Sequence, residues 1–275
     1  DANSRKILQG ETGLPRFQDI RQRCPDWIRR LEVNELQACG HELVGKCLIV
    51  SHCWEDPANP DLKGVQLARI VEHLEKNPAI EYVWYDFWCL AQGTERAAAD
   101  EREFKSHLAH VNWLYLGASV LLIVDMSTLG RFWTQYEAWL SMQSATLSGL
   151  QPASKADLRA TTVCIHNAED DMEGRKLSKL WSTRSAKEAH EVLSGTDVRV
   201  TNASDKAIHL PKIEKMDEFV RDTLQAARRG KEERAKALED EIVALLKSGS
   251  LRREAVLEAV QRGAPLLPGG YKFGE

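Results

Sequence analysis

The stretch RFWTQYEAWL, residues 131–140, places a single carboxylate among aromatic rings. It follows the apolar run ASVLLIVD and a short polar loop, so Glu137 lies near the start of a predicted helix. Trp133, Tyr136, Glu137 and Leu140 are spaced by three or four residues and therefore share one side of that helix. An acid in this setting is either an ordinary solvent-facing helix residue or a group that binds sugar hydroxyls. In the second case it can also stabilise an oxocarbenium-like charge, as carboxylates do in glycoside cleavage.

Two further polar segments follow apolar runs in the same way. The run CLIV is followed by Ser51, His52, Cys53 and Trp54, and the run around YVWY is followed by Asp86, Phe87 and Trp88. Asp86 either caps the following turn and pairs with a base, or faces a ligand. Adjacent Cys53 and His52 raise the alternative of a cysteine nucleophile, but neighbouring side chains seldom face each other, so a histidine from elsewhere would be needed.

The composition and the missing motifs exclude several classes of function. The 275 residues carry a net charge of −4, with 43% hydrophobic and 28% charged residues, which is ordinary for a soluble globular protein. We therefore expect neither a nucleic-acid nor a membrane partner. Phosphate-binding glycine motifs and metal-binding sequence motifs do not occur. Six cysteines without CxxC spacing, and a start without an apolar signal core, predict a reduced protein of the cytoplasm.

Strands and helices are predicted to alternate along the chain. Apolar runs predict strands at 47–50, about 79–86, 118–125 and 159–168, and DVRVTN predicts a short fifth strand. Amphipathic segments predict helices over 25–38, 64–77, 100–116, 131–147 and 183–194, and a helix from 212 that ends at Gly230. Two more helices, broken at SGS, are expected within 231–262. This order indicates an α/β fold with a parallel sheet.

The predicted sheet gives the three polar segments a common location. Ligands of open parallel sheets bind outside the carboxyl ends of the strands, and all three segments follow strand ends. We therefore expect them to converge at one edge. The chain is divided into an N-terminal helical extension (1–44), an α/β domain (45–230) and a C-terminal helical extension (231–275).

Two stretches resemble a known domain family. LIVSHCWED resembles the first strand and loop of TIR (Toll/interleukin-1 receptor) domains, and ASVLLIVDMSTLGRFWTQYEAWL resembles the TIR segment that leads to a Trp-Cys-x-x-Glu helix start. Here Thr134 stands where cysteine is usual. YVWYDFWCLAQG is similar to the Trp-x-Asp-x-x-Cys-x-x-Gln stretch of fungal heterokaryon-incompatibility (HET) domains, which are TIR-like. The resemblance covers residues 45–145 by motif and 160–229 by topology, and it implies a flavodoxin-like five-stranded parallel sheet flanked by helices.

The resemblance also implies roles for individual residues. Glu137 matches the catalytic glutamate of TIR domains that hydrolyse NAD at the nicotinamide–ribose bond. The loop after the first strand would border the nucleotide, the loop that begins at Asp86 would gate the site and join neighbouring copies, and Trp133 matches the tryptophan of the helix start. The residues expected to bind substrate are Ser51, His52, Cys53, Trp54, Asp86, Phe87, Trp88 and Trp133.

The implied activity is that of an NAD glycohydrolase in defence or signalling, hydrolysing or cyclising its substrate and assembling into homo-oligomers. NAD is then the substrate, and no cofactor or metal is expected. Two alternatives remain open. One is a non-enzymatic TIR/HET-like signalling and assembly module, and the other is a nucleoside deoxyribosyltransferase-like enzyme.

Overall fold

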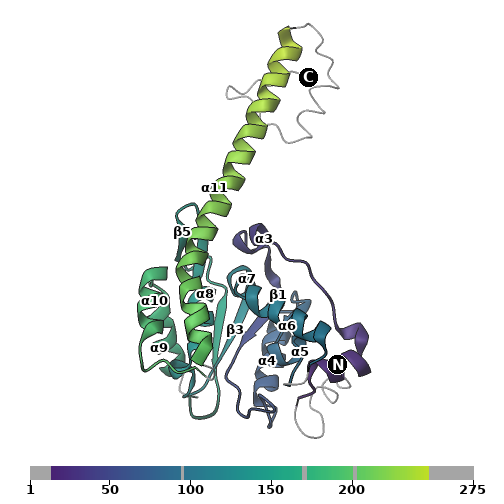
Figure 1. Cartoon of the computed structure of the whole chain (residues 1–275), viewed down its shortest axis with the longest axis vertical. Helices are drawn as coiled ribbons and strands as arrows, with labels where there is room; N and C mark the ends of the chain where they lie inside the picture. Colours follow the sequence, from purple (N-terminus) through teal and green to yellow (C-terminus); the bar gives the residue numbers. More distant parts are fainter. Residues whose placement is uncertain (1–13, 94–95, 169–171, 201–202, 248–275) are drawn as a thin grey trace. The chain divides into compact units, whose positions relative to one another are not determined.

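The structure is a computed structural model that describes residues 14–93, 96–168, 172–200 and 203–247 (Figure 1). The chain divides into two compact units, Asp1–Arg221 and Asp222–Glu275. All described strands belong to the first unit. The described part of the second unit is the continuation of helix α11 (Ala203–Lys247). The extensions predicted for 1–44 and 231–275 remain predictions.

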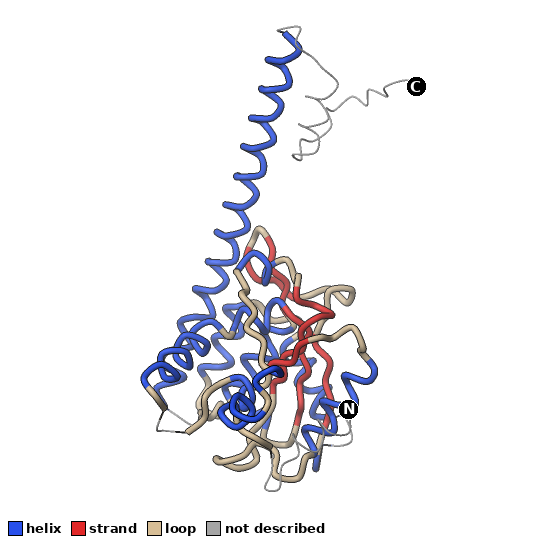
Figure 2. The backbone as a smooth tube through the Cα atoms, turned by 90° about the vertical axis from the view of Figure 1, so that its right-hand side faces the viewer, coloured by secondary structure: helices blue, strands red, loops and turns tan. Residues whose placement is uncertain are grey.

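A parallel sheet forms the centre of the first unit. Its order is β2-β1-β3-β6, built from β2 (Tyr82–Trp84), β1 (Leu43–Ser51), β3 (Ala118–Val124) and β6 (Ala160–Cys164). The strands of this sheet are among the red segments of Figure 2. The α/β class and the parallel sheet are therefore confirmed. The central strands are continuous apolar runs because both faces of the sheet are covered.

The predicted fifth strand is not part of this sheet in the described chain. Arg199 forms one isolated bridge with Arg131. Its backbone N–H donates to Gly130 O (2.7 Å), and its carbonyl accepts from Phe132 N (2.9 Å). These bonds tie the segment to the start of helix α8 (Phe132–Ser141) and not to β6.

Helices lie against both faces of the sheet. On one face, Leu48 and Val50 of β1 join Leu67 and Ile70 of α4 (Val65–Lys76) in a single buried cluster. On the other face, α7 (Asn112–Gly117) and α8 contact β1 and β3, and α9 (Met172–Trp181) contacts β6. Successive strand residues point to opposite faces, so Ser51 lies on the α8 side, two residues after Ile49.

Several predicted helices have different bounds. The segment 100–116 is divided into α6 (Ala98–His110) and α7. The helix predicted over 131–147 ends at Ser141, and an antiparallel hairpin of β4 (Gln143–Thr146) and β5 (Gly149–Pro152) follows. Gly149 has φ 102°, a value that favours glycine, and the next N–H, of Leu150, donates to the carboxylate of Asp217 (2.6 Å). Long-range pairing therefore prevails over helix propensity here.

The predicted helix over 25–38 is wrong. The segment holds a 3₁₀ turn, η1 (Pro25–Trp27), and a short helix, α3 (Glu35–Cys39), which Asn34 caps by accepting from Gln37 N (2.9 Å). The residues between them are mostly exposed, so a helix there would bury little apolar surface to stabilise it.

The remaining elements complete the described chain. They are α2 (Phe17–Arg23), α5 (Asp86–Cys89), η2 (Thr128–Gly130), η3 (His166–Ala168) and α10 (Ala186–Ser194). The helix expected to end at Gly230 continues to Lys247, while the SGS break and the helix after it lie outside the described residues. In the described part of the chain, no helix combines the length and apolarity that crossing a bilayer requires.

Gly117 allows α7 to approach α3 closely, and this contact can be tested. A Cβ on Gly117 would lie 2.6 Å from Ala38 Cα, which is backbone and cannot swing aside. We expect Gly117→Ala to lower the free energy of unfolding by about 1–3 kcal/mol, as overpacking does. The matched control is Gly230→Ala, because a Cβ there meets nothing within 4 Å and alanine favours helix. Urea unfolding that shows no loss for Gly117→Ala would contradict the close contact.

Candidate functional site

The polar segments after β1, β2 and β3 do meet at one edge of the sheet. Parallel strands have their carboxyl ends on the same side, and β1, β2 and β3 end at Ser51, Trp84 and Val124. Ser51 contacts Glu137 of α8, and His52 contacts Asp86 of α5. The predicted convergence is therefore confirmed for these four residues.

Glu137 is a half-buried residue whose carboxylate accepts a hydrogen bond from Ser51. Ser51 Oγ donates to Glu137 Oε2 at 2.6 Å, while the Tyr115 hydroxyl of α7 donates to Val50 O (3.5 Å) and lies near enough to the Glu137 carboxylate to lower its pKa. Burial raises the pKa of Glu137 to about 7, and the charge of Asp86 adds to the rise. The two hydroxyls and the nearby His52 act in the opposite direction. Both protonation states of Glu137 are consequently populated near neutral pH.

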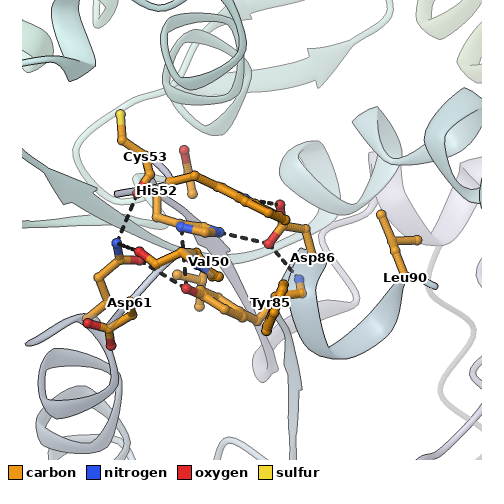
Figure 3. Close-up of polar contacts among 12 residues, drawn as sticks. Val50, His52, Cys53, Asp61, Tyr85, Asp86 and Leu90 are labelled. Atoms are coloured by element: carbon orange, nitrogen blue, oxygen red, sulfur yellow. Dashed lines mark hydrogen bonds and ion pairs between the residues drawn. The ribbon is translucent and has the colours of Figure 1, made fainter. Parts of the chain in front are cut away.

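Asp86 accepts three hydrogen bonds from its surroundings. Oδ1 accepts from the Phe87 backbone N–H (2.6 Å) and lies 2.8 Å from His52 Nε2, while Oδ2 accepts from Trp54 Nε1 (2.9 Å). Burial raises the pKa of Asp86, but His52 and the other donors outweigh it, so the net shift is downward. Asp86 is therefore an ionised anchor for both His52 and Trp54 (Figure 3).

Only some of the aromatic residues that follow β1 and β2 are exposed enough to contact a ligand. Phe87 is 1% exposed and belongs to the core cluster, and Trp54 packs edge-on against it with ring centroids 5.4 Å apart. Trp88 lies against Tyr85, 4.6 Å between ring centroids. Trp54 and Trp88 are only partly buried, so they remain able to stack a flat ligand, whereas Phe87 serves packing.

Two predicted site residues point elsewhere. Cys53 is buried, with Sγ 3.6 Å from Thr128 Oγ1, and Figure 3 shows its sulfur directed away from Asp86. Burial raises the pKa of this thiol, which opposes a role as nucleophile. The Trp133 ring packs against His209 of α11, with centroids 4.5 Å apart, and against Phe132.

Sequence reasoning missed several polar residues of this edge. Tyr115 lies in a predicted helix, and no motif around it marks it as a site residue. In the structure its hydroxyl lies close enough to Glu137 for the two groups to affect each other's pKa. His166, directly after β6, has a φ of 53° and places Nε2 2.6 Å from Glu55 Oε1. The position of His166 at a strand end, and not its neighbours in the sequence, is the signal that could have found it.

Among the described residues, no group of three or more histidine, cysteine, aspartate or glutamate side chains is placed to hold a metal ion. Comparison with known proteins gave no match to this chain from a family model, a curated protein or a solved structure.

Proposed function

We propose that this protein is a TIR-like NAD glycohydrolase that cleaves the nicotinamide–ribose bond, with Glu137 stabilising the ribose oxocarbenium. One observation carries the proposal. Glu137 lies at the carboxyl edge of a parallel sheet, accepts a hydrogen bond from Ser51, and has a pKa raised to about 7. Perturbed carboxyls of this kind are typical of functional sites.

Cleavage of this bond requires an ionised carboxylate that stabilises positive charge, and not a protonated acid that donates to the leaving group. Nicotinamide leaves as a neutral molecule from a cationic glycoside, so the C1′–N bond breaks with its electron pair going to the ring nitrogen. Positive charge then develops on the ribose, where an ionised Glu137 would stabilise it. Water attacks C1′ and loses a proton to solvent, giving ADP-ribose, and a ribose or base nucleophile would give a cyclic product instead.

The surroundings of Glu137 support the same assignment. Trp54 and Trp88 follow β1 and β2 at the same carboxyl edge, and we assign their half-buried rings to stacking of nicotinamide or adenine. The strand order β2-β1-β3-β6 is consistent with the first four strands of a flavodoxin-like sheet, which the TIR resemblance implies. A role in defence or signalling, a cytoplasmic location and assembly into homo-oligomers through TIR-type contacts complete the proposal.

Release of free nicotinamide from NAD tests this function. Wild type at high protein concentration should release nicotinamide, and Glu137→Ala should release about a thousandfold less, the size of effect seen when one transition-state contact is removed. The rate should fall about tenfold per pH unit below about 7 and reach a plateau above it, because the ionised form is the active one. Trp133→Phe is the matched control, since its ring packs against His209.

Three outcomes would replace the proposal. Equal release by wild type and Glu137→Ala would remove Glu137 from the mechanism. Turnover of a nucleoside in place of NAD would favour a deoxyribosyltransferase-like enzyme. No turnover of either substrate by an assembled sample would favour the signalling and assembly module.

A further inference from the structure

A buried chain of polar contacts runs from Gln66 through Tyr85 and His52 to Asp86. Gln66, 1% exposed on α4, has its Nε2 2.9 Å from Cys53 O and 2.8 Å from Pro60 O. Two carbonyl oxygens only accept, so both amide hydrogens of Gln66 are committed to them. Gln66 Oε1 must therefore point the other way and accept a hydrogen bond.

The hydroxyl of Tyr85 supplies that bond. Tyr85 is fully buried, and its Oη lies 3.0 Å from Gln66 Oε1. The single hydrogen of the Tyr85 hydroxyl is therefore donated to Gln66. The side of the hydroxyl that faces His52 carries only lone pairs. His52 Nδ1 lies 3.4 Å from this oxygen, and the two rings are stacked with centroids 4.2 Å apart (Figure 3). Because the hydrogen of Tyr85 is taken, its hydroxyl offers no donor to the lone pair of a bare Nδ1, whereas the nearby Cys53 backbone favours a protonated ring and raises the pKa of His52.

The other ring nitrogen of His52 also needs a hydrogen. Nε2 faces Asp86 Oδ1 at 2.8 Å, and Asp86 is already bonded by the Trp54 and Phe87 N–H groups, which favour its ionised form. If Nε2 carried no hydrogen, its lone pair would face the Asp86 carboxylate and repel it. Only a doubly protonated ring gives every polar atom of the chain from Gln66 to Asp86 a partner.

We propose that His52 is an imidazolium at neutral pH, and that this positioning residue holds Glu137 in its ionised, ribose-binding form. The inference deepens the proposed function and rests on the role assigned there to Glu137. His52 directly follows Ser51, the last residue of β1, so two adjacent residues supply Glu137 with a hydrogen bond and a nearby positive charge.

The charged and titratable groups around His52 come from several elements. Asp86 of α5 and Glu137 of α8 are the two carboxylates that act on it, Tyr85 follows β2, and the Cys53 carbonyl also contributes. Glu55 and Asp61 act on Tyr85 from the loop after β1. Burial lowers the pKa of His52, but Asp86, Glu137 and the Cys53 carbonyl outweigh it, so the net direction is upward. The imidazolium is thus a positive group that acts on both Asp86 and Glu137.

Nitrogen-15 NMR of the histidine rings tests the protonation state. In wild type at pH 7–8, both His52 nitrogens should show the chemical shifts of protonated nitrogen, with the resonances identified by their loss in His52→Gln. One bare nitrogen at this pH would overturn the proposal. In Gln66→Met, Tyr85 regains a free hydrogen that it can donate to Nδ1, so the neutral ring becomes acceptable. This variant should lose the Nδ1 proton at a lower pH than wild type, and no change would contradict the hydrogen-bond chain.

Carbon-13 NMR of the Glu137 carboxyl tests the effect on the site. His52→Gln keeps a donor for Asp86 but removes the charge, so the ratio of ionised to neutral Glu137 at fixed pH should fall about tenfold. The plateau of nicotinamide release should begin at correspondingly higher pH. His107→Gln, on α6 with a side chain that is 45% exposed, is the control and should leave the ratio unchanged.

An unchanged Glu137 ratio in folded His52→Gln would overturn the positioning role. These NMR measurements need no turnover. If they give the expected shifts while NAD is not cleaved, the proposed function fails and the charge assignment stands. If His52→Gln does not fold, the wild-type spectrum and Gln66→Met still decide the protonation state, and Gln66→Met should lower the Glu137 ratio in the same direction.

Discussion

Glu137→Gln should raise the unfolding temperature at pH 8 and leave it nearly unchanged at pH 4, while it removes nicotinamide release. In the folded protein the pKa of Glu137 is about 7, because burial disfavours the charged form of its carboxyl group. In the unfolded chain the group is an ordinary glutamate with a pKa of about 4.3. Folding therefore takes up a proton between these two values, and the stability of the wild type falls as the pH rises through this window.

The magnitude follows from the separation of the two pKa values. A difference of between two and three pH units corresponds to at most about 3–4 kcal/mol, and partial solvent access to Glu137 reduces this to about 1–2 kcal/mol. Glutamine stays neutral, so above pH 7 the variant does not lose the free energy of unfolding that the wild type loses when Glu137 ionises. Below the unfolded pKa both proteins are neutral at this position and should unfold alike.

Thermal unfolding at a series of pH values measures this effect. Glu188→Gln is the informative control, because Glu188 accepts from Ser185 at the start of α10 and its pKa is lowered. A lowered pKa stabilises the fold above the unfolded value and loses that effect as the pH falls, so this variant should be no more stable than wild type at pH 8. A lower unfolding temperature for Glu137→Gln at pH 8 would show that the ionised carboxylate is stabilised by the fold.

Arg159→Met should destabilise the protein by about 3–5 kcal/mol, the largest loss expected from a single substitution away from Glu137. Arg159 is 7% exposed, and its guanidinium donates to three backbone carbonyls. Nη1 bonds to Gln143 O (2.6 Å), and Nη2 bonds to Leu140 O (2.9 Å) and Tyr115 O (3.2 Å). These carbonyls end α7 and α8 and begin β4, where backbone acceptors lack helical partners.

Methionine matches much of the length of arginine but donates nothing, so three buried carbonyls would lose their partner. Burial lowers the pKa of Arg159 to about 9, because removing the guanidinium cation from water is unfavourable. Arg159→Lys retains a charge with fewer donors and should lie between wild type and Arg159→Met in urea unfolding. If Arg159→Met unfolds at the wild-type urea concentration, the three bonds contribute nothing to stability.

Arg159 also bears on the site, although it lies at the opposite edge of the sheet. Tyr115 and Glu137 are carried by the two helices whose ends it joins. Nicotinamide release by folded Arg159→Lys should therefore be reduced, because the hydroxyl of Tyr115 and the carboxylate of Glu137 would no longer be held in register.

The sequence predicts the parts of this protein whose cause is local. The apolar runs at 47–50 and 118–124 form the two central strands, since only buried strands tolerate such continuous apolar residues. The placing of Ser51, Asp86 and Glu137 at one edge follows from the same strands, because parallel pairing puts their exits together. The proximity of Ser51 to Glu137 and of His52 to Asp86 is the part of the site that could be predicted from the sequence.

The features that the sequence did not predict depend on distant partners. Asp217 on α11 accepts from Leu150 and so favours a hairpin where helical spacing continues. Arg199 bonds to the start of α8, which removes the expected fifth strand from the sheet. Tyr115 and Gln66 gain their roles from contacts across 22 and 19 positions, with Glu137 and Tyr85. Neither residue type nor periodicity encodes such a pairing.

The two carboxylates of the site are attached to parts of the fold with unequal resistance to local opening. Glu137 is carried by a helix packed on β1 and β3, which are paired on both sides. Asp86 follows β2, an edge strand of only three residues. Short edge elements open at a lower free energy than central ones, although opening here would also expose Tyr85 and Phe87, which belong to the core cluster. Such a fluctuation would withdraw Asp86, and with it the anchor of Trp54, leaving Ser51 and Glu137 in place and admitting solvent to the edge between them.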